Sequence, residues 1–325
     1  MLHRLTFTVL LAVCLLLSGC AGGPSGSRPA VATVGSSDPS AGTAVAAPET
    51  GCGSDSRAAG STGTVSVTVN GTVREARLHV PSGYDGTTPT AVILAFVGHG
   101  MSTDKLESFS DLDGGDAFVL YPQPAGTDPQ NGWESAPYAS GQDDVAFVGA
   151  LLDTLQARAC VDTRRIFAAG ISNGGGFVSL LSCRLPERIA AFAVVSGAAY
   201  PADNPTCPSA TAVPIVEFHG TADPVIPYDG GTRHDATIEP VAQWLDEQAQ
   251  RNACAPSPTR TSIGSDVVEQ EWSGCHGRGA LVHYRVEGGG HTWPGATAES
   301  GPGAITRTIS ATRIIEDFFA AHTLS

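Results

Sequence analysis

The sequence predicts an α/β protein built on a doubly wound, mostly parallel β-sheet, with an antiparallel hairpin at its start. Two observations support this fold class. After residue 90, short apolar runs alternate with amphipathic segments of helical period, which is the order expected for parallel strands joined by helices. The run at residues 91–97 is apolar throughout, as in a strand buried on both faces.

The individual elements follow from the same patterns. Residues 64–70 and 73–80 alternate apolar and polar side chains around Asn70-Gly71, a pair that favours a tight hairpin turn. The later strands are expected at residues 91–97, 116–121, 165–169, 190–195, 213–218 and 281–286. The helices are expected at residues 143–159, 175–185, 238–251 and 306–322.

The most informative stretch is Gly170-Ile171-Ser172-Asn173-Gly174, which lies between an expected strand and an expected helix. A serine flanked by glycines at such a turn is the nucleophile elbow of the α/β-hydrolase fold. Side chains at 170 and 174 would clash in so tight a turn, so glycine fits there. We therefore predict Ser172 as a nucleophile. The alternative is an ordinary turn serine, because the bare pattern also arises by chance in a chain with 39 glycines.

Two later residues, Asp223 and His291, complete a candidate triad. In this fold the acid and then the histidine follow the serine, each after a strand. Asp223 follows the strand at 213–218, and His291 follows the strand at 281–286 in a loop that opens with three glycines. His291 would accept the proton of Ser172, and Asp223 would fix the imidazole tautomer. Asp223 before Pro224 also fits a simple turn, but the order of the three residues favours catalysis.

Acyl transfer also needs two N–H donors for the oxyanion of the tetrahedral intermediate. The residue after the nucleophile supplies one, so we assign it to the backbone N–H of Asn173. The loop after an early strand supplies the other, and we place it at the backbone N–H of His99. The side chains of His99 and His219 are expected to be structural, because a histidine at a strand end often hydrogen-bonds a loop.

The N-terminal part of the chain is expected to lie outside the fold. Residues 1–19 read as a signal peptide, with Arg4 before an apolar run at 7–17 that is too short for a spanning helix. The run ends in Leu17-Ser18-Gly19-Cys20, which resembles the lipobox of bacterial lipoproteins and implies lipidation of Cys20. A plain secretory signal is the alternative. Residues 20–50 read as a flexible tether, and residues 51–325 as one α/β-hydrolase domain on the outer side of the membrane or secreted.

Six cysteines remain after residue 50, and an even number in an exported chain favours disulfides. None shows the short spacing of a zinc site. Six cysteines allow fifteen pairings, and the sequence alone does not choose among them. Local position favours the pairs Cys254–Cys275 and Cys183–Cys207, which leaves Cys52–Cys160.

The formal net charge of −14 argues against nucleic acid and other polyanionic partners. It is compatible with a neutral ester or a neutral polysaccharide. We expect no metal ion and no organic cofactor, because the triad chemistry needs neither. Contact with a membrane is expected through the N-terminal lipid alone, and the oligomeric state is not indicated.

Several motifs, in and around the triad, together match the pattern of one protein family. They are Tyr121-Pro122 followed by Gly132-Trp133, residues 143–148, Cys160-Val161-Asp162, residues 170–175, residues 219–223, Cys275 and residues 289–295. On these motifs the chain resembles the secreted feruloyl esterase and polyhydroxybutyrate depolymerase-like group of α/β-hydrolases. By motif match the nucleophile, acid and base of that family fall on Ser172, Asp223 and His291. The Gly51-Cys52-Gly53 start resembles its feruloyl esterase members.

One segment departs from the pattern of the family. The family usually has His-Gly where this chain has Val97-Gly98, and a His-Gly pair follows here at His99-Gly100. Either the loop register has shifted or the histidine is lost, and the second oxyanion donor depends on which.

The resemblance implies a serine ester hydrolase that acts on feruloylated or acetylated polysaccharide or on hydroxyalkanoate esters. Trp133 and Trp293 are candidates to line its substrate site, because aromatic faces suit acyl groups and sugars. The alternative is that both are core residues. Two other functions are weighed: a serine peptidase on the same fold, and a non-catalytic lipoprotein that binds a wall polymer. The first normally carries a propeller or cap domain, and the second is favoured only by the altered loop at Val97-Gly98.

Overall fold

The computed structural model describes residues 51–54, 57–126, 131–201, 207 and 211–325. The expected signal peptide at 1–19, the lipidation site Cys20 and the tether at 20–50 lie outside these residues. The described residues belong to one compact unit. Among the described residues, no helix has both the length and the apolar character needed to cross a membrane.

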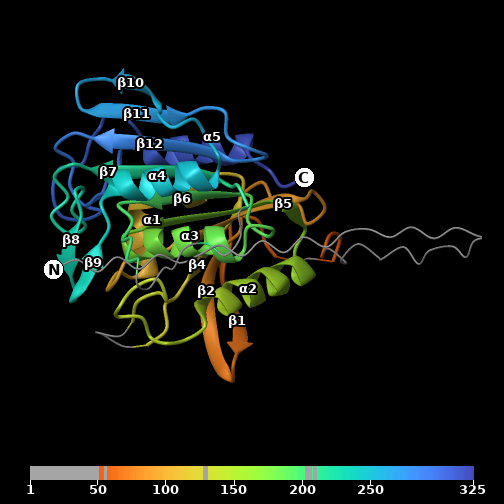
Figure 1. The fold of residues 1–325 in the computed structure, drawn as a ribbon. Helices are drawn as coiled ribbons and strands as arrows, with labels where there is room; N and C mark the ends of the chain where they lie inside the picture. The colour runs from red at the N-terminus through yellow and green to blue at the C-terminus, as the bar shows by residue number, and fades with distance from the viewer. Residues whose placement is uncertain (1–50, 55–56, 127–130, 202–206, 208–210) are drawn as a thin grey trace, which may run out of the picture. The chain divides into compact units, whose positions relative to one another are not determined.

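A single large sheet organises the fold (Figure 1). Within the described residues its ten strands lie in the order β1-β2-β4-β3-β5-β6-β7-β12-β11-β10. The strands from β4 to β12 in this order run parallel to one another. They are β4 (Phe118–Pro122), β3 (Thr90–Phe96), β5 (Val161–Ile171), β6 (Ala191–Val195), β7 (Pro214–Gly220) and β12 (Ala280–Val286). The predicted mostly parallel sheet is confirmed.

An antiparallel hairpin extends the sheet at each edge. The first is β1 (Thr62–Val69) with β2 (Thr72–His79), and its turn residues Asn70 and Gly71 have φ angles of 50° and 81°. This is the predicted hairpin. The second, β10 (Thr259–Ile263) with β11 (Val267–Trp272), was not predicted. Its strand β10 is almost wholly exposed, so it lacks the buried apolar residues that reveal a strand in a sequence.

Helices cover both faces of the sheet, as the doubly wound prediction requires. Figure 1 shows α2 (Asp144–Arg158), α3 (Asn173–Arg184) and α4 (Val241–Arg251) in front of the sheet. It shows α1 (Thr103–Ser110) and α5 (Ala311–Ala321) behind it. Three short elements complete the described fold: the 3₁₀ turn η1 (Leu112–Gly114) and the strands β8 (Gly231–Arg233) and β9 (Ala236–Ile238).

Two helices begin later than their sequence patterns predict. The final helix starts at Ala311 instead of residue 306, because the hydroxyl groups of Thr306 and Thr308 both bind Asp266 and hold this segment outside the helix. Helix α4 starts at Val241 after Pro240, and the residues before it form strand β9. Helix α1 was not predicted.

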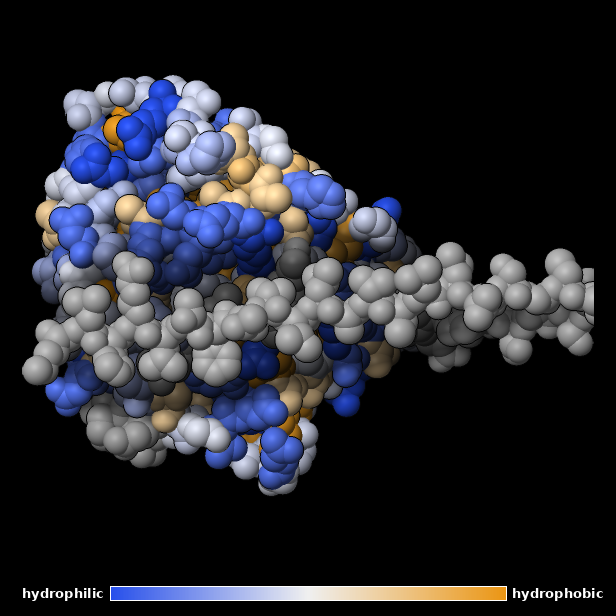
Figure 2. All heavy atoms as spheres, viewed as in Figure 1, coloured by the Kyte–Doolittle hydropathy of each residue, from blue (hydrophilic) through white to orange (hydrophobic). Residues whose placement is uncertain are grey.

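The core is built around stacked aromatic rings. Trp133 stacks on Phe177 with ring centroids 5.0 Å apart, and Phe96 meets Trp133 edge-on at 5.3 Å. On the other face of the sheet, Phe319 of α5 stacks on Phe167 of β5 at 4.6 Å. Outside this core, the exposed positions of α4 carry mainly polar side chains, which form a hydrophilic band across the face shown in Figure 2.

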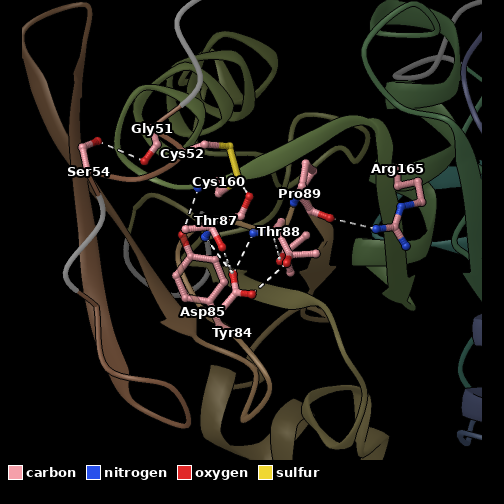
Figure 3. The surroundings of a disulfide bond; sticks show 11 residues. Gly51, Cys52, Ser54, Tyr84, Asp85, Thr87, Thr88, Pro89, Cys160 and Arg165 are labelled. Atoms are coloured by element: carbon pink, nitrogen blue, oxygen red, sulfur yellow. Dashed lines mark hydrogen bonds between the residues drawn. A yellow bond between two sulfur atoms is a disulfide. The ribbon is translucent and has the colours of Figure 1, made fainter.

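The described residues contain the two disulfides favoured by local position, Cys183–Cys207 and Cys254–Cys275, and the remaining pair, Cys52–Cys160. The first joins the start of the domain to the residue before β5 (Figure 3). Beside it, the Gly51 N–H donates to the Gln156 carbonyl at 3.1 Å, and the Cys160 N–H donates to the Tyr84 hydroxyl at 2.9 Å. Such cross-links indicate a protein of an oxidising, extracytoplasmic compartment.

Candidate active site

The three residues of the predicted triad lie at the same edge of the sheet. Ser172 follows β5, Asp223 follows β7, and His291 follows β12. These strands are parallel, and β7 pairs directly with β12. The carboxyl ends of parallel strands meet at one edge, which is where ligands bind in open α/β sheets.

Ser172 occupies a strained turn between β5 and α3. Its φ and ψ angles are 59° and −123°, a conformation that non-glycine residues rarely adopt. Its N–H donates to the Val195 carbonyl at 2.9 Å, and its carbonyl accepts from the N–H groups of Gly176 and Ala198, each at 3.0 Å. These bonds hold the serine at the tip of the turn, where it stays partly exposed.

The two glycines of the elbow are required by backbone contact. A Cβ atom on Gly170 would lie 2.5 Å from the carbonyl oxygen of Gly174. A Cβ atom on Gly174 would lie 2.2 Å from the carbonyl oxygen of Phe96 in β3. Both distances are far inside van der Waals contact, so the steric reason given for glycine at these two positions is confirmed.

Asp223 and His291 form a buried hydrogen-bonded pair. Asp223 Oδ2 lies 2.7 Å from His291 Nδ1, and Oδ1 accepts the N–H groups of Val225 and Ile226 at 2.7 and 2.8 Å. Burial by itself raises the pKa of the Asp223 carboxyl, but the hydrogen bond and charge of His291 outweigh it and lower that pKa. An ionised carboxylate only accepts, so Nδ1 carries the proton and Nε2 can accept one.

The loops that carry this pair pack backbone to backbone. A Cβ atom on Gly220 would lie 2.2 Å from the Gly289 carbonyl oxygen, and one on Gly290 would lie 2.5 Å from Gly303 Cα. The Ala222 N–H also donates to the Gly289 carbonyl at 2.9 Å. Gly220 and Gly289 therefore allow a close approach of the acid and base loops.

The surroundings of Ser172 suit an oxyanion. Asn173 is the first residue of α3, and N–H groups in the first turn of a helix have no partner within the helix. Its side-chain oxygen accepts the Trp133 N–H at 2.8 Å, which fixes the residue in place. A Cβ atom on Gly98 would lie 3.0 Å from Ser172 Cβ, so the loop that contains His99 lies against the nucleophile. Val97, which replaces the histidine of the family, is buried, and its carbonyl accepts from the Trp133 indole at 2.9 Å.

The prediction that Trp133 and Trp293 line a substrate site is wrong. Each is only 1% exposed. Trp133 belongs to the aromatic stack with Phe177, and the Trp293 indole donates to the Thr312 hydroxyl at 3.0 Å. A ring enclosed on all sides by the protein cannot stack on a substrate, so both are core residues, the alternative given above.

A different group of rings lies beside the loop of Gly98. The His99 and Tyr138 rings are 4.3 Å apart between centroids, and Tyr138 is 4.5 Å from His234 on the exposed turn between β8 and β9. We call His99, Tyr138 and His234 the ring cluster. Sequence reasoning did not find it, because its members come from three separate loops.

Four further polar side chains behind Asp223 were also missed as a group. They are Glu217, His219, Tyr228 and His283, and the two histidines both contact Glu217. The signal was present in the sequence, since Glu217 and His283 each interrupt an apolar strand. The structural role expected for His219 is seen in its contact with the Ile226 carbonyl oxygen at 2.9 Å.

One group of side chains among the described residues could share a cation: His79, Glu107 and Asp113. Arg77 already forms an ion pair with Glu107 there. His79 ends β2, which runs antiparallel to β4, so the group lies at the opposite edge of the sheet from Ser172. It is not part of the candidate active site.

The parallel sheet, the strained serine at its carboxyl edge and the acid–histidine pair beside it define an α/β-hydrolase. The Esterase PHB depolymerase family matches residues 113–234. The putative esterase NocK of Nocardia uniformis subsp. tsuyamanensis is 30% identical over 290 residues, which cover 78% of this chain and 80% of that protein. The chain therefore belongs to this family of serine carboxylic ester hydrolases.

Other relatives carry more specific names. Feruloyl esterase D of Neurospora crassa is 28% identical over 261 residues, covering 76% of this chain and 83% of that protein. Feruloyl esterase B of Piromyces equi is 29% identical over 230 residues, covering 67% of this chain, but the chain spans only 42% of that relative's length.

Solved structures agree on the fold. Acetyl xylan esterase from Aspergillus awamori superposes with a TM-score of 0.55 at 15% identity, over 79% of this chain and 98% of that one. Thermogutta terrifontis esterase 2 phosphonylated by cyclosarin gives 0.54 at 13% identity, over 80% of this chain and 94% of that one. At these identities the likeness concerns the fold alone.

Proposed function

We propose that the protein hydrolyses carboxylic esters through an acyl-enzyme, with Ser172 as nucleophile, His291 as general base and Asp223 as the acid that orients it. The observation that carries this proposal is the 2.7 Å hydrogen bond between Asp223 and His291 at the same sheet edge as the strained Ser172. A hydrolase of this kind needs each of these three roles.

The proposed reaction is that of a serine hydrolase. His291 Nε2 takes the proton of Ser172 as its oxygen attacks the ester carbonyl, and the backbone N–H groups of Asn173 and His99 stabilise the oxyanion. Each donor of this kind lowers the barrier by about 3 kcal/mol. The intermediate expels the alcohol, which takes the proton from His291. Water then attacks the acyl-enzyme by the same route and releases the acid.

For the substrate we propose an ester that joins an aromatic acyl group to a polysaccharide. The ring cluster supports this, because His99 adjoins Gly98, which lies against Ser172. Stacked or edge-on rings favour an aromatic acyl group over a small aliphatic one. The names of the feruloyl esterase relatives agree. Acetylated polysaccharide and hydroxyalkanoate polyester are the other substrates that the experiment compares.

For the location we propose a lipid anchor at Cys20, on the motif at residues 17–20. An acylated N-terminal cysteine would hold the enzyme on the outer face of the membrane, where its disulfides persist. Detergent partitioning of the full chain and of Cys20→Ser tests this. If the full chain and Cys20→Ser partition into the aqueous phase to the same extent, the anchor is contradicted.

The test of the proposed function is a panel of esters assayed with the purified protein. Methyl ferulate, p-nitrophenyl acetate, p-nitrophenyl butyrate and a hydroxybutyrate oligomer would each be measured beside Ser172→Ala. We expect methyl ferulate to be preferred, and Ser172→Ala to lower kcat by a factor on the order of 10⁴ or more. Ser108→Ala is the matched control, since Ser108 is an exposed serine of α1.

Two outcomes would contradict the proposal. Absence of hydrolysis by a folded protein would exclude ester hydrolysis on this panel, and equal activity in Ser172→Ala would exclude the assigned nucleophile. A fluorophosphonate probe separates these cases, because it labels an activated serine whatever the acyl specificity.

A further inference from the structure

A chain of polar side chains, three of them buried, runs behind Asp223, and the proposed reaction does not use it. It consists of Glu217 on β7, His283 on β12, and His219 and Tyr228 at and after the end of β7. Glu217, His219 and His283 are 2%, 1% and 0% exposed. Glu217 and His283 are direct partners in the register of the two strands. So many ionisable groups are rarely buried together unless their charges compensate.

The contacts of His219 place a proton on each of its ring nitrogens. Nε2 lies 2.9 Å from the carbonyl oxygen of Ile226, and a carbonyl can only accept a hydrogen bond. Nδ1 lies 3.1 Å from Glu217 Oε1. If Glu217 is ionised, it too only accepts, and the ring of His219 is an imidazolium.

His283 differs from His219 in its second partner. Its Nδ1 lies 2.5 Å from Glu217 Oε2, so it also faces the carboxylate. Its Nε2, however, lies 3.0 Å from the hydroxyl of Tyr228, which can donate as well as accept. Of the two histidines, only His219 therefore faces nothing but acceptors at both ring nitrogens.

His219 also connects this group to the catalytic acid. The N–H of Ile226 donates to Asp223 Oδ1, while the carbonyl of the same residue faces His219. The Nε2 atom of His219 lies 3.5 Å from Asp223 Oδ2, the oxygen that accepts from His291. A single ring therefore fixes the turn at residues 223–226 and directs positive charge at the acid–base pair.

We propose that His219, held as an imidazolium by Glu217, is a positioning residue for Asp223, and that the charge of this pair sets the lower pH limit of activity. This inference rests on the proposed function, because it takes Asp223 and His291 to be the catalytic pair. A cation near His291 disfavours its protonated form, and so keeps it available as a base at lower pH.

The electrostatic surroundings of the pair favour the same charge states as the geometry. Burial alone lowers the pKa of His219, but the hydrogen bond and charge of Glu217 outweigh it and raise that pKa. Burial alone raises the pKa of Glu217, but His283 and His219 together lower it. Each group thus favours its charged form because of its neighbours.

Besides Asp223, His291 and His283, three ionisable groups lie around the Glu217–His219 pair and have to be considered in any pH profile: Glu239, Tyr228 and Arg285. Glu239 lines the same small cavity as Glu217 and His219, and burial raises its pKa to about 7. Tyr228 has a pKa raised to about 12 by burial, so its hydroxyl stays protonated at working pH. The Arg285 guanidinium lies 5.4 Å from the Tyr228 ring centroid.

The direct test is nuclear magnetic resonance of the whole protein labelled with ¹⁵N-histidine, with His219→Gln to assign the signal. We expect both nitrogens of His219 to show the shift of a protonated nitrogen from pH 6 to pH 8. Variant His276→Gln is the control, since His276 is an exposed histidine. An unprotonated nitrogen in His219 at pH 6 would overturn the proposal, whatever the protein's activity.

A pH profile of kcat/KM tests the functional half. His219→Gln removes the cation but leaves Glu217. We therefore expect the midpoint of the acid limb to shift to a higher pH, by about half to one pH unit. We expect kcat to fall about tenfold and KM to change less than twofold. Glu217→Gln should release the proton of His219 and leave the limb nearly unchanged. In the double variant, two neutral glutamines replace an anion and a cation whose charges cancel. The acid limb should therefore return to its wild-type position.

These outcomes separate the proposal from a merely structural role. A structural role predicts a fall in kcat with the same acid limb in all variants, which would overturn the inference. If His219→Gln fails to fold, the spectrum of Glu217→Gln still decides it, because only the proposal predicts that one histidine doubly protonated in the wild type loses a proton in this variant. Failure of the proposed function itself would appear instead as full activity in Ser172→Ala.

Discussion

The two halves of the candidate active site are held in place by different means. Around Ser172, main-chain atoms pack against main-chain atoms: Gly174 meets the backbone of Phe96, and Gly170 meets the backbone of Gly174. Around Asp223 the loop backbones also pack closely, but ionisable side chains flank the carboxylate, with His291 on one side and His219 and Glu217 on the other. The first half depends on shape alone, and the second depends on charge as well.

The difference shows how each half should respond to change. A steric fit does not depend on pH, but one added methyl group destroys it. A group of buried charges tolerates small changes of volume, but it fails when one partner is removed or titrated. Mutations that alter shape alone or charge alone should therefore affect the two halves differently, and the following predictions are ordered from the largest effect.

The largest effect is expected at the charged half, from Asp223→Asn. The amide of asparagine has nearly the volume of the carboxylate, but it can turn a donor toward His291 Nδ1 and favour the wrong tautomer. We expect kcat to fall on the order of 10⁴-fold while the melting temperature stays within a few degrees. A loss of less than tenfold in kcat would show that the Asp223 carboxylate is not needed, and would contradict the claim that this half of the site depends on charge.

The matching change in the steric half is Gly174→Ala. The new Cβ would lie 2.2 Å from the Phe96 carbonyl oxygen, so we expect a loss of about 3 kcal/mol in the free energy of unfolding. Gly149→Ala is the control, because its Cβ would meet nothing within 4 Å in the middle of α2. It should stabilise the protein by about 0.5–1 kcal/mol. Urea unfolding measures both, and equal midpoints for the two variants would contradict the steric account.

The smallest effect is expected at Glu239, a buried carboxylate near Glu217 that lacks a comparable counter-charge. Burial, and then the charge of Glu247, raises its pKa to about 7 in the folded protein, above the ordinary value of 4.5. Its stabilising contribution is therefore complete below pH 4.5 and is lost as the pH rises through 7. Glu239→Gln avoids the ionised form, so it should be more stable than the wild type by about 1 kcal/mol at pH 8 and equal to it at pH 4.5.

Thermal unfolding at pH 4.5, 6 and 8 checks this difference. Glu271→Gln, at an exposed position of β11, is the control and should follow the wild type within about 0.5 kcal/mol at each pH. A constant offset for Glu239→Gln across the series would show that the buried carboxylate does not titrate in this range.

The same contrast explains what could be predicted from the sequence. The steric half can be predicted from local spacing, since Gly170 and Gly174 flank Ser172 within one turn. Asn70-Gly71 predicts the β1–β2 hairpin in the same way. The positions of Asp223 and His291 follow from the order of strands and loops. The edge hairpin at β10 and β11 could not be predicted, because its exposed strand has no apolar alternation.

The charged half depends on which strands become neighbours. Glu217 and His283 meet because β7 pairs with β12, and no local pattern gives that register. The prediction that Trp133 and Trp293 line the substrate site was wrong for a related reason. A ring that packs on Phe177 and a ring that would pack on a substrate look the same in a sequence, so the burial of Trp133 emerges only from the tertiary structure.

The disulfide at the start of the domain has a mechanical consequence. Cys52 is bonded to Cys160, which directly precedes β5, the strand whose other end leads to Ser172. Tension on the chain ahead of Gly51 therefore passes through a covalent bond into a central strand, and the edge hairpin β1–β2 is shielded from the load. Such a force would act at the amino-terminal end of β5, with the full length of the strand between it and the catalytic turn.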